Sequence, residues 1–308
     1  MKKLSFVLLA LLACPSYATV YDLDVAMNNV RNACSGINSK MDHLKLMAGI
    51  NTGIGAVGTV TGAVALGTGI AKAQKDKEIE DLMVKIAEKL KDAPEFSEQD
   101  KADLIADFSK NWAEWSKENS EEAQKINKLT EESKTLGNVR TGMLAANTAT
   151  SIAGAVISSQ NKANGSIKEA IENCISATDD LRESMMQARL DGHDTTDAKR
   201  IVDACTEYKF ADLSKINKLA TGSTVTSSIG AVAGGIGTIT SAVANTDKTR
   251  NDNSKAGQDK EKNLNTASNV LSGVTTATSA ISTVLNGVQI ATIKKVVSIS
   301  ERCEEELQ

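Results

Sequence analysis

The sequence of 308 residues contains few aromatic residues, few prolines and few histidines. Aromatic residues make up only 3% of the chain, so a core must be built from aliphatic and small side chains. Because proline interrupts helix interiors, the presence of only two prolines permits very long helices. The two histidines, His43 and His193, lie far apart in sequence, which disfavours a histidine-based metal site or a catalytic triad.

The sequence also lacks the signatures of several large functional classes. The formal net charge is -4, so the chain has no basic footprint of a nucleic-acid-binding protein. It contains no P-loop, nucleophile elbow or zinc-protease motif. The glycines of residues 53–58 have dinucleotide-fingerprint spacing, but they lie inside a long helical pattern and indicate helix packing instead. We therefore expect a non-enzymatic protein without catalytic residues, cofactor or metal ligands.

The first 18 residues resemble a secretory signal peptide. Two lysines precede an apolar run at residues 4–13, and small residues stand at the -3 and -1 positions before Thr19. We expect an exported chain that begins at Thr19 and resides in the periplasm, at the cell surface or outside the cell. One alternative is a lipobox that ends at Cys14 and makes this cysteine a lipidated first residue; another is a short retained anchor.

The same order of features occurs twice along the chain, which indicates an internal duplication. Each copy contains a cysteine, a segment rich in glycine, alanine and threonine, a polar insert, a second such segment and another cysteine. The first copy covers residues 19–190 and includes a charged helical insert at about 74–137; the second covers residues 191–308. Each copy is predicted to form an antiparallel helical hairpin.

Four of the five cysteines remain after removal of the signal peptide, and an even number in an exported chain favours two disulfides. If the first and last helices of each hairpin bring their cysteines together, the pairs are Cys34–Cys174 and Cys205–Cys303. The alternatives are the pairing Cys174–Cys205 with Cys34–Cys303, and four free thiols.

Aliphatic residues recur at alternating intervals of three and four, which is the heptad spacing of a coiled coil. The clearest run comprises Ile229, Val232, Ile236, Ile239 and Val243. We expect this stripe to face a neighbouring helix. A similar pattern predicts one continuous helix from about Leu23 to Lys72. Glycines beside the stripes are expected to permit close helix packing; they are Gly49, Gly53, Gly58, Gly62, Gly230 and Gly234.

Four segments carry no charged residue: residues 46–71, 141–161, 219–246 and 263–293. Each is long enough to span a bilayer, which takes about 20 residues. Their composition, however, favours an aqueous environment over a membrane. Most of their residues are threonine, serine, asparagine, alanine or glycine, and no segment has the aromatic residues at both ends that are typical of transmembrane helices. The pattern therefore favours water-exposed coiled coils over permanent transmembrane helices.

The predicted fold class is all-α: two tandem, elongated, antiparallel helical hairpins packed as a coiled-coil-like bundle through heptads rich in Gly, Ala, Ser and Thr. The first functional hypothesis is an exported structural or interaction protein of a bacterial envelope, with helical surfaces for self-association or a protein partner. The alternative is a membrane-active protein that inserts its uncharged hairpins into a bilayer. In general character, such hairpins are similar to those of α-helical pore-forming toxins, although no shared motif accompanies the likeness.

Overall fold

The computed structural model describes residues 19–91, 120–250, 252 and 254–308, and all regular secondary structure in these residues is helical. The predicted signal peptide and the central part of the charged insert lie outside the described residues. The helices are α1 (Thr19–Cys34), α2 (Ile37–Lys91), α5 (Ser120–Gln160), α6 (Gly165–Leu190), α7 (Thr196–Cys205), η1 (Thr206–Phe210), α8 (Leu213–Ala244), α9 (Asp247–Arg250) and α10 (Lys255–Leu307).

The helix predicted from Leu23 to Lys72 is interrupted once. Ser35 and Gly36 separate α1 from α2, and Gly36 has a φ of 75°. This left-handed conformation is readily adopted by glycine and commonly ends helices. Beyond the break, α2 continues past the predicted end to Lys91.

The chain forms two compact units. Among the described residues, unit 1 combines 19–49, Asn161–Ala220 and Gly287–Gln308, and unit 2 combines 50–91, 120–160 and the described part of Thr221–Asn286. Both units therefore contain segments from both predicted copies. The duplication itself stays a prediction, since it concerns sequence order rather than compactness.

Unit 1 has a hydrophobic core of buried aliphatic residues. Its large aliphatic side chains are buried together, which removes them from water as the hydrophobic effect requires. Burial also raises the pKa of Tyr208 in this unit to about 12. The core residues include Val30, Ile37, Met41, Leu44, Ile167, Ile171, Leu181, Ile201, Ile216, Ile293 and Val296.

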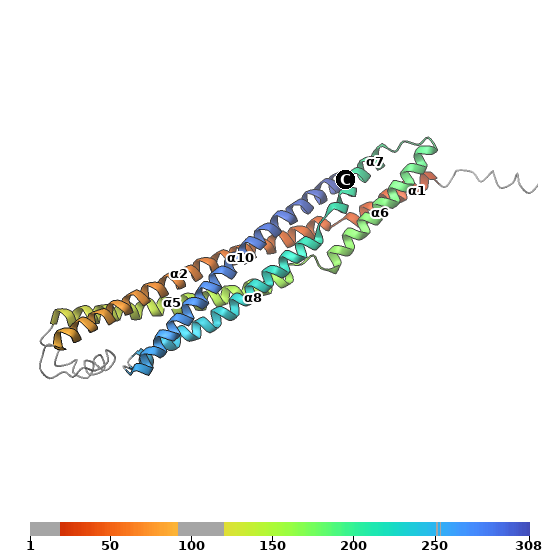
Figure 1. Ribbon diagram of the computed structural model, residues 1–308. Coiled ribbons are helices and arrows are strands. Elements are labelled where there is room, and N and C mark those ends of the chain that lie inside the picture. Colours follow the sequence, from red (N-terminus) through yellow and green to blue (C-terminus); the bar gives the residue numbers. More distant parts are fainter. Residues whose placement is uncertain (1–18, 92–119, 251, 253) are drawn as a thin grey trace, which may run out of the picture. The chain divides into compact units, whose positions relative to one another are not determined.

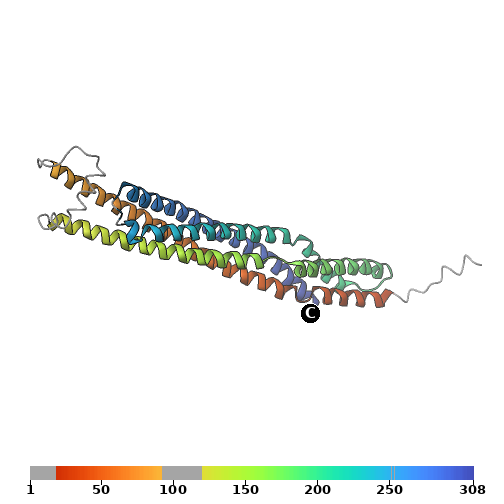
Figure 2. The same ribbon diagram turned by 90° about the horizontal axis from the view of Figure 1, so that it is seen from below.

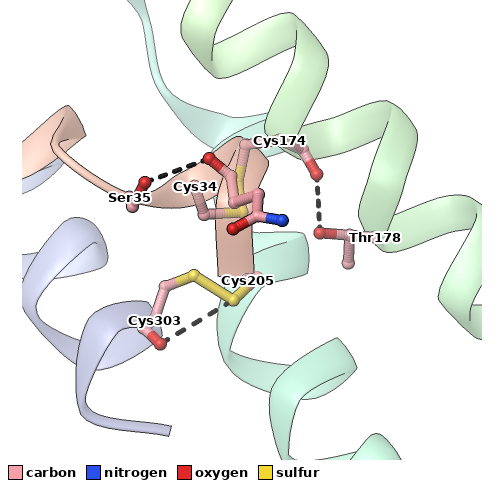
Figure 3. The surroundings of a disulfide bond; sticks show 7 residues. Cys34, Ser35, Cys174, Thr178, Cys205 and Cys303 are labelled. Carbon is pink, nitrogen blue, oxygen red and sulfur yellow. Dashed lines mark hydrogen bonds between the residues drawn. A yellow bond between two sulfur atoms is a disulfide. The ribbon is translucent and has the colours of Figure 1, made fainter. Parts of the chain in front are cut away.

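Two disulfides cross-link unit 1 (Figure 3). Cys34 at the end of α1 is bonded to Cys174 of α6, and Cys205 at the end of α7 is bonded to Cys303 of α10. All four cysteines are fully buried. The structure thus has the pairing that the hairpin argument favours.

Unit 2 is built from four long helices that lie side by side. The second part of α2 runs alongside α5, and α8 runs alongside α10 (Figures 1 and 2). Gly58 of α2 faces Thr150 of α5 and Ser279 of α10, and Gly230 of α8 faces Ser151 of α5. The four helices therefore share one interior.

Removal of one disulfide is expected to destabilise unit 1 strongly. In the chain-entropy account, a cross-link between cysteines 98 residues apart contributes about 4–5 kcal/mol. The double variant Cys205→Ser/Cys303→Ser should therefore unfold at a lower guanidinium concentration, with a loss of about 4 kcal/mol in unfolding free energy. The matched variant Cys34→Ser/Cys174→Ser should lose at least as much, because its cysteines are 140 residues apart. Unchanged midpoints in both variants would contradict this role.

Candidate functional site

The interior of unit 2 consists of small and polar residues. Its buried positions recur at intervals of three and four along each long helix. In α2 they are Asn51, Gly55, Gly58, Gly62, Ala65, Gly69 and Lys72. In α5 they include Arg140, Leu144, Asn147, Ser151, Gly154 and Ser158. In α8 they include Ser223, Ser227, Gly230, Gly234, Gly237 and Ser241. In α10 they include Ser268, Ser272, Thr275, Ser279, Ser282 and Asn286.

The large aliphatic residues of unit 2 lie on its outer surface instead. The stripe of α8 from Ile229 to Val243 is 37–65% exposed at its five aliphatic positions. The prediction that this stripe faces a neighbouring helix is therefore wrong. The other three helices are alike, with exposed Val57, Val60 and Val64 in α2, Ile152 and Val156 in α5, and Val270, Val274, Ile281, Val284 and Val288 in α10.

Close approach of the helix backbones explains why branched side chains are excluded from this interior. A methyl group added at Gly62 would lie 2.5 Å from Asn147 Nδ2 and 3.1 Å from the backbone Cα of Thr276. At Gly234 it would lie 2.6 Å from Thr148 Oγ1. Valine or isoleucine cannot occupy such positions without separating the helices, so these residues take the outer positions.

The six glycines expected at helix contacts divide into two groups. Gly58, Gly62, Gly230 and Gly234 face side chains of neighbouring helices. In contrast, Gly49 and Gly53 are exposed, and an added methyl group there would meet no heavy atom within 4 Å. Sequence spacing identified the helices but did not separate the inner from the outer glycines.

Several buried hydroxyl and amide groups in unit 2 bind one another between helices. Ser223 of α8 lies 2.9 Å from the hydroxyl of Ser158 and 2.8 Å from that of Ser282. Asn51 of α2 donates to both Ser158 and Ser223. A cavity of about 10 Å³ next to Asn51 is close to the lower limit for one water molecule. The interior is thus a packed polar seam, held by hydrogen bonds among four helices.

Two buried cations mark one end of this seam. Lys72 Nζ lies 2.6 Å from Asp76 Oδ2 and 3.2 Å from Glu261 Oε1. Arg140 donates to the backbone carbonyl of Asn265 at 3.0 Å. Burial lowers the pKa of Arg140 to about 10, so the guanidinium remains protonated at neutral pH. These two cations therefore lie directly next to the uncharged segments 46–71 and 141–161.

The cysteines offer no obvious metal centre in their oxidised state. The sulfur atoms of Cys34, Cys174 and Cys303 lie within 4.8 Å of one another in unit 1. Each is bonded to another sulfur, however, and the thiolate is the form that binds metals. These residues serve as cross-links here.

Two stretches of the described chain are long and apolar enough to cross a membrane. They are Leu23–Lys85 and Thr196–Ala244. Only 22% and 39% of their most apolar windows are buried. A core helix of a soluble protein is mostly buried, so these stretches differ from ordinary core helices.

Comparisons with protein-family models, curated proteins and solved structures find no match to the chain. The inverted distribution of polar and apolar residues in unit 2 is therefore the main guide to function.

Substitutions at one inner and one outer glycine should change stability in opposite directions. Gly62→Ala adds a methyl group against the Thr276 backbone and should lower the unfolding free energy by about 1–3 kcal/mol. Gly53→Ala adds the same group in open space and should raise it by up to about 1 kcal/mol, because alanine favours helix. Thermal unfolding followed by circular dichroism measures both effects; equal shifts for the two variants would contradict the assignment of the helix faces.

Proposed function

We propose that this protein is an exported membrane-active protein. On this proposal, the uncharged part of unit 2 occupies a lipid bilayer, while the disulfide-linked unit 1 stays in water. Each predicted hairpin then supplies one antiparallel pair of helices to the membrane: α2 with α5, and α8 with α10. The predicted internal duplication would account for the presence of two such pairs.

The distribution of residues in unit 2 carries the proposal. In water, exposure of valine and isoleucine is unfavourable, and these side chains would be expected inside, as they are in unit 1. In a bilayer the preference reverses, because outward aliphatic residues meet acyl chains and polar groups must find partners within the protein. The Ser158, Ser223 and Ser282 hydroxyl groups illustrate the second requirement.

The arrangement around the bundle favours a bilayer over a single protein partner. Exposed aliphatic residues occur on α2, α5, α8 and α10 alike. One partner would cover one side of the bundle and leave the other apolar surfaces in water. A bilayer covers all of them at once. Small residues at the helix contacts also fit, since they are typical of helix packing in membranes.

The uncharged segments have suitable lengths. At 1.5 Å per residue, the shortest of them, residues 141–161, extends about 30 Å, which matches the hydrocarbon thickness of a bilayer. Charged residues such as Lys72 and Arg140 flank these segments rather than interrupt them. Two disulfides also suit an oxidising, extracytoplasmic compartment.

Flotation of the purified, oxidised chain with lipid vesicles tests this proposal. We expect the chain to float with vesicles of phosphatidylcholine and phosphatidylglycerol and to resist extraction by alkaline carbonate. Release of an encapsulated dye in the same samples would report whether insertion also permeabilises the bilayer. A chain that stays in the aqueous fraction as a defined oligomer would overturn the proposal and favour a self-associating structural protein.

Charges placed on the outer surface of unit 2 should abolish insertion without unfolding the protein in water. Val232 and Val284 are each 64% exposed, so Val232→Lys/Val284→Lys has room for both ammonium groups. A lysine near the middle of a bilayer costs about 2.5–3.5 kcal/mol. The vesicle-bound fraction should therefore fall at least 50-fold.

A matched control removes an exposed aliphatic residue elsewhere. Leu190, at the end of α6 in unit 1, is 88% exposed, and Leu190→Lys should leave vesicle binding unchanged. Circular dichroism of both variants in water should match that of the wild type. Equal vesicle binding by the wild type and the double variant would contradict the assignment of the valines to the lipid-facing surface.

A further inference from the structure

One end of every uncharged segment adjoins a lysine in unit 1. Lys45 precedes residues 46–71 and Lys218 precedes residues 219–246. Lys162 and Lys294 follow the two remaining segments. We name Lys45, Lys162, Lys218 and Lys294 the lysine collar.

Hydrogen bonds hold the collar segments at one level of unit 1. Gln289 of α10 donates to the backbone carbonyl of Asn161 at 2.9 Å and to that of Ile216 in α8 at 3.4 Å. In the amide orientation that satisfies both of its polar atoms, Asn161 donates to the Leu44 carbonyl of α2 at 3.0 Å. A further bond joins Asn217 to the Ala163 carbonyl at 3.2 Å.

These bonded residues lie next to the collar in the chain. Lys45 follows Leu44, Lys162 follows Asn161, and Lys218 lies close after Ile216. Lys294 lies little more than one helical turn beyond Gln289. The four ammonium groups therefore belong to the same end of the four uncharged segments.

Collar lysines are at least partly exposed and mostly lack acidic partners. Lys45 Nζ lies 3.6 Å from Asp42. Within the described part of the chain, no carboxylate oxygen lies within 4 Å of the ammonium group of Lys162, Lys218 or Lys294. Their charge is thus available to a ligand outside the protein.

At the opposite end of the uncharged segments, two cations are paired within unit 2. Lys72 contacts Asp76 and Glu261, and Lys75 lies 3.0 Å from Glu132. Lys248 and Lys262 at that end are exposed, so this end carries positive charge as well.

We propose that the lysine collar binds the phosphate groups of anionic phospholipids. This inference rests on the proposed insertion of unit 2. A lysine beside an apolar helical segment can lay its methylene chain along the acyl region and reach the headgroup with its ammonium group.

Partition onto vesicles of two compositions tests this inference. The triple variant Lys162→Gln/Lys218→Gln/Lys294→Gln removes the unpaired charges and keeps the approximate side-chain size. On vesicles with one quarter phosphatidylglycerol in phosphatidylcholine, its partition coefficient should be about 100-fold below that of the wild type, since each lysine near an anionic surface contributes about fivefold. On pure phosphatidylcholine the two proteins should bind alike.

The control variant Lys168→Gln/Lys199→Gln/Lys248→Gln makes the same change in net charge at exposed positions away from the collar. It should retain most of the preference for phosphatidylglycerol. Equal losses in the two variants would show a general charge effect and would contradict phosphate binding by the lysine collar. Equal partition of the wild type onto both vesicle types, with insertion into each, would contradict this binding alone and leave the proposed insertion intact. A wild type that binds neither vesicle would overturn the proposed membrane function as well.

Discussion

Close contact between helix backbones is the constraint on which the rest of unit 2 depends. Glycines such as Gly62 and Gly234 bring the helices so near that only small side chains fit between them. Serine, threonine and asparagine share these inner positions and bind one another across the bundle. Branched aliphatic residues must then occupy the outer surface. The exposed apolar surface is therefore a consequence of how the helices pack.

The two units distribute their apolar residues differently. Unit 1 buries residues such as Met41, Leu181 and Ile293 and adds two disulfides, as is common for exported proteins that must stay folded in water. Unit 2 shows the reverse distribution along most of its length. At its charged end, however, Ala123 and Ile126 are buried against Leu82, so the usual distribution returns once charged residues reappear. The inversion thus coincides with the uncharged segments.

Periodicity and cysteine count predicted much of the fold, but they could not assign the helix faces. The all-helical class follows from helical spacing, and both cysteine pairs are those that the hairpin argument favoured among the alternatives. The break at Gly36 was missed because a single glycine is compatible with a helix. The faces were missed because aliphatic and small residues both recur at three and four; choosing the aliphatic stripe as the inner one assumes that water surrounds the bundle. Val232 is exposed and Ser227 is buried, which is the opposite of the distribution expected on that assumption.

If unit 2 lies in a bilayer as proposed, its outer surface contacts acyl chains. Spin labels on cysteines introduced one at a time along residues 223–243, in vesicle-bound protein, would measure this contact. Accessibility to oxygen, which is concentrated in the bilayer, should peak at Val225, Ile229, Val232, Ile236 and Ile239. Accessibility to a water-soluble nickel relaxant should be low at the same positions. Strong relaxation of these labels by the nickel reagent would show that the outer surface is in water and would overturn the proposed insertion.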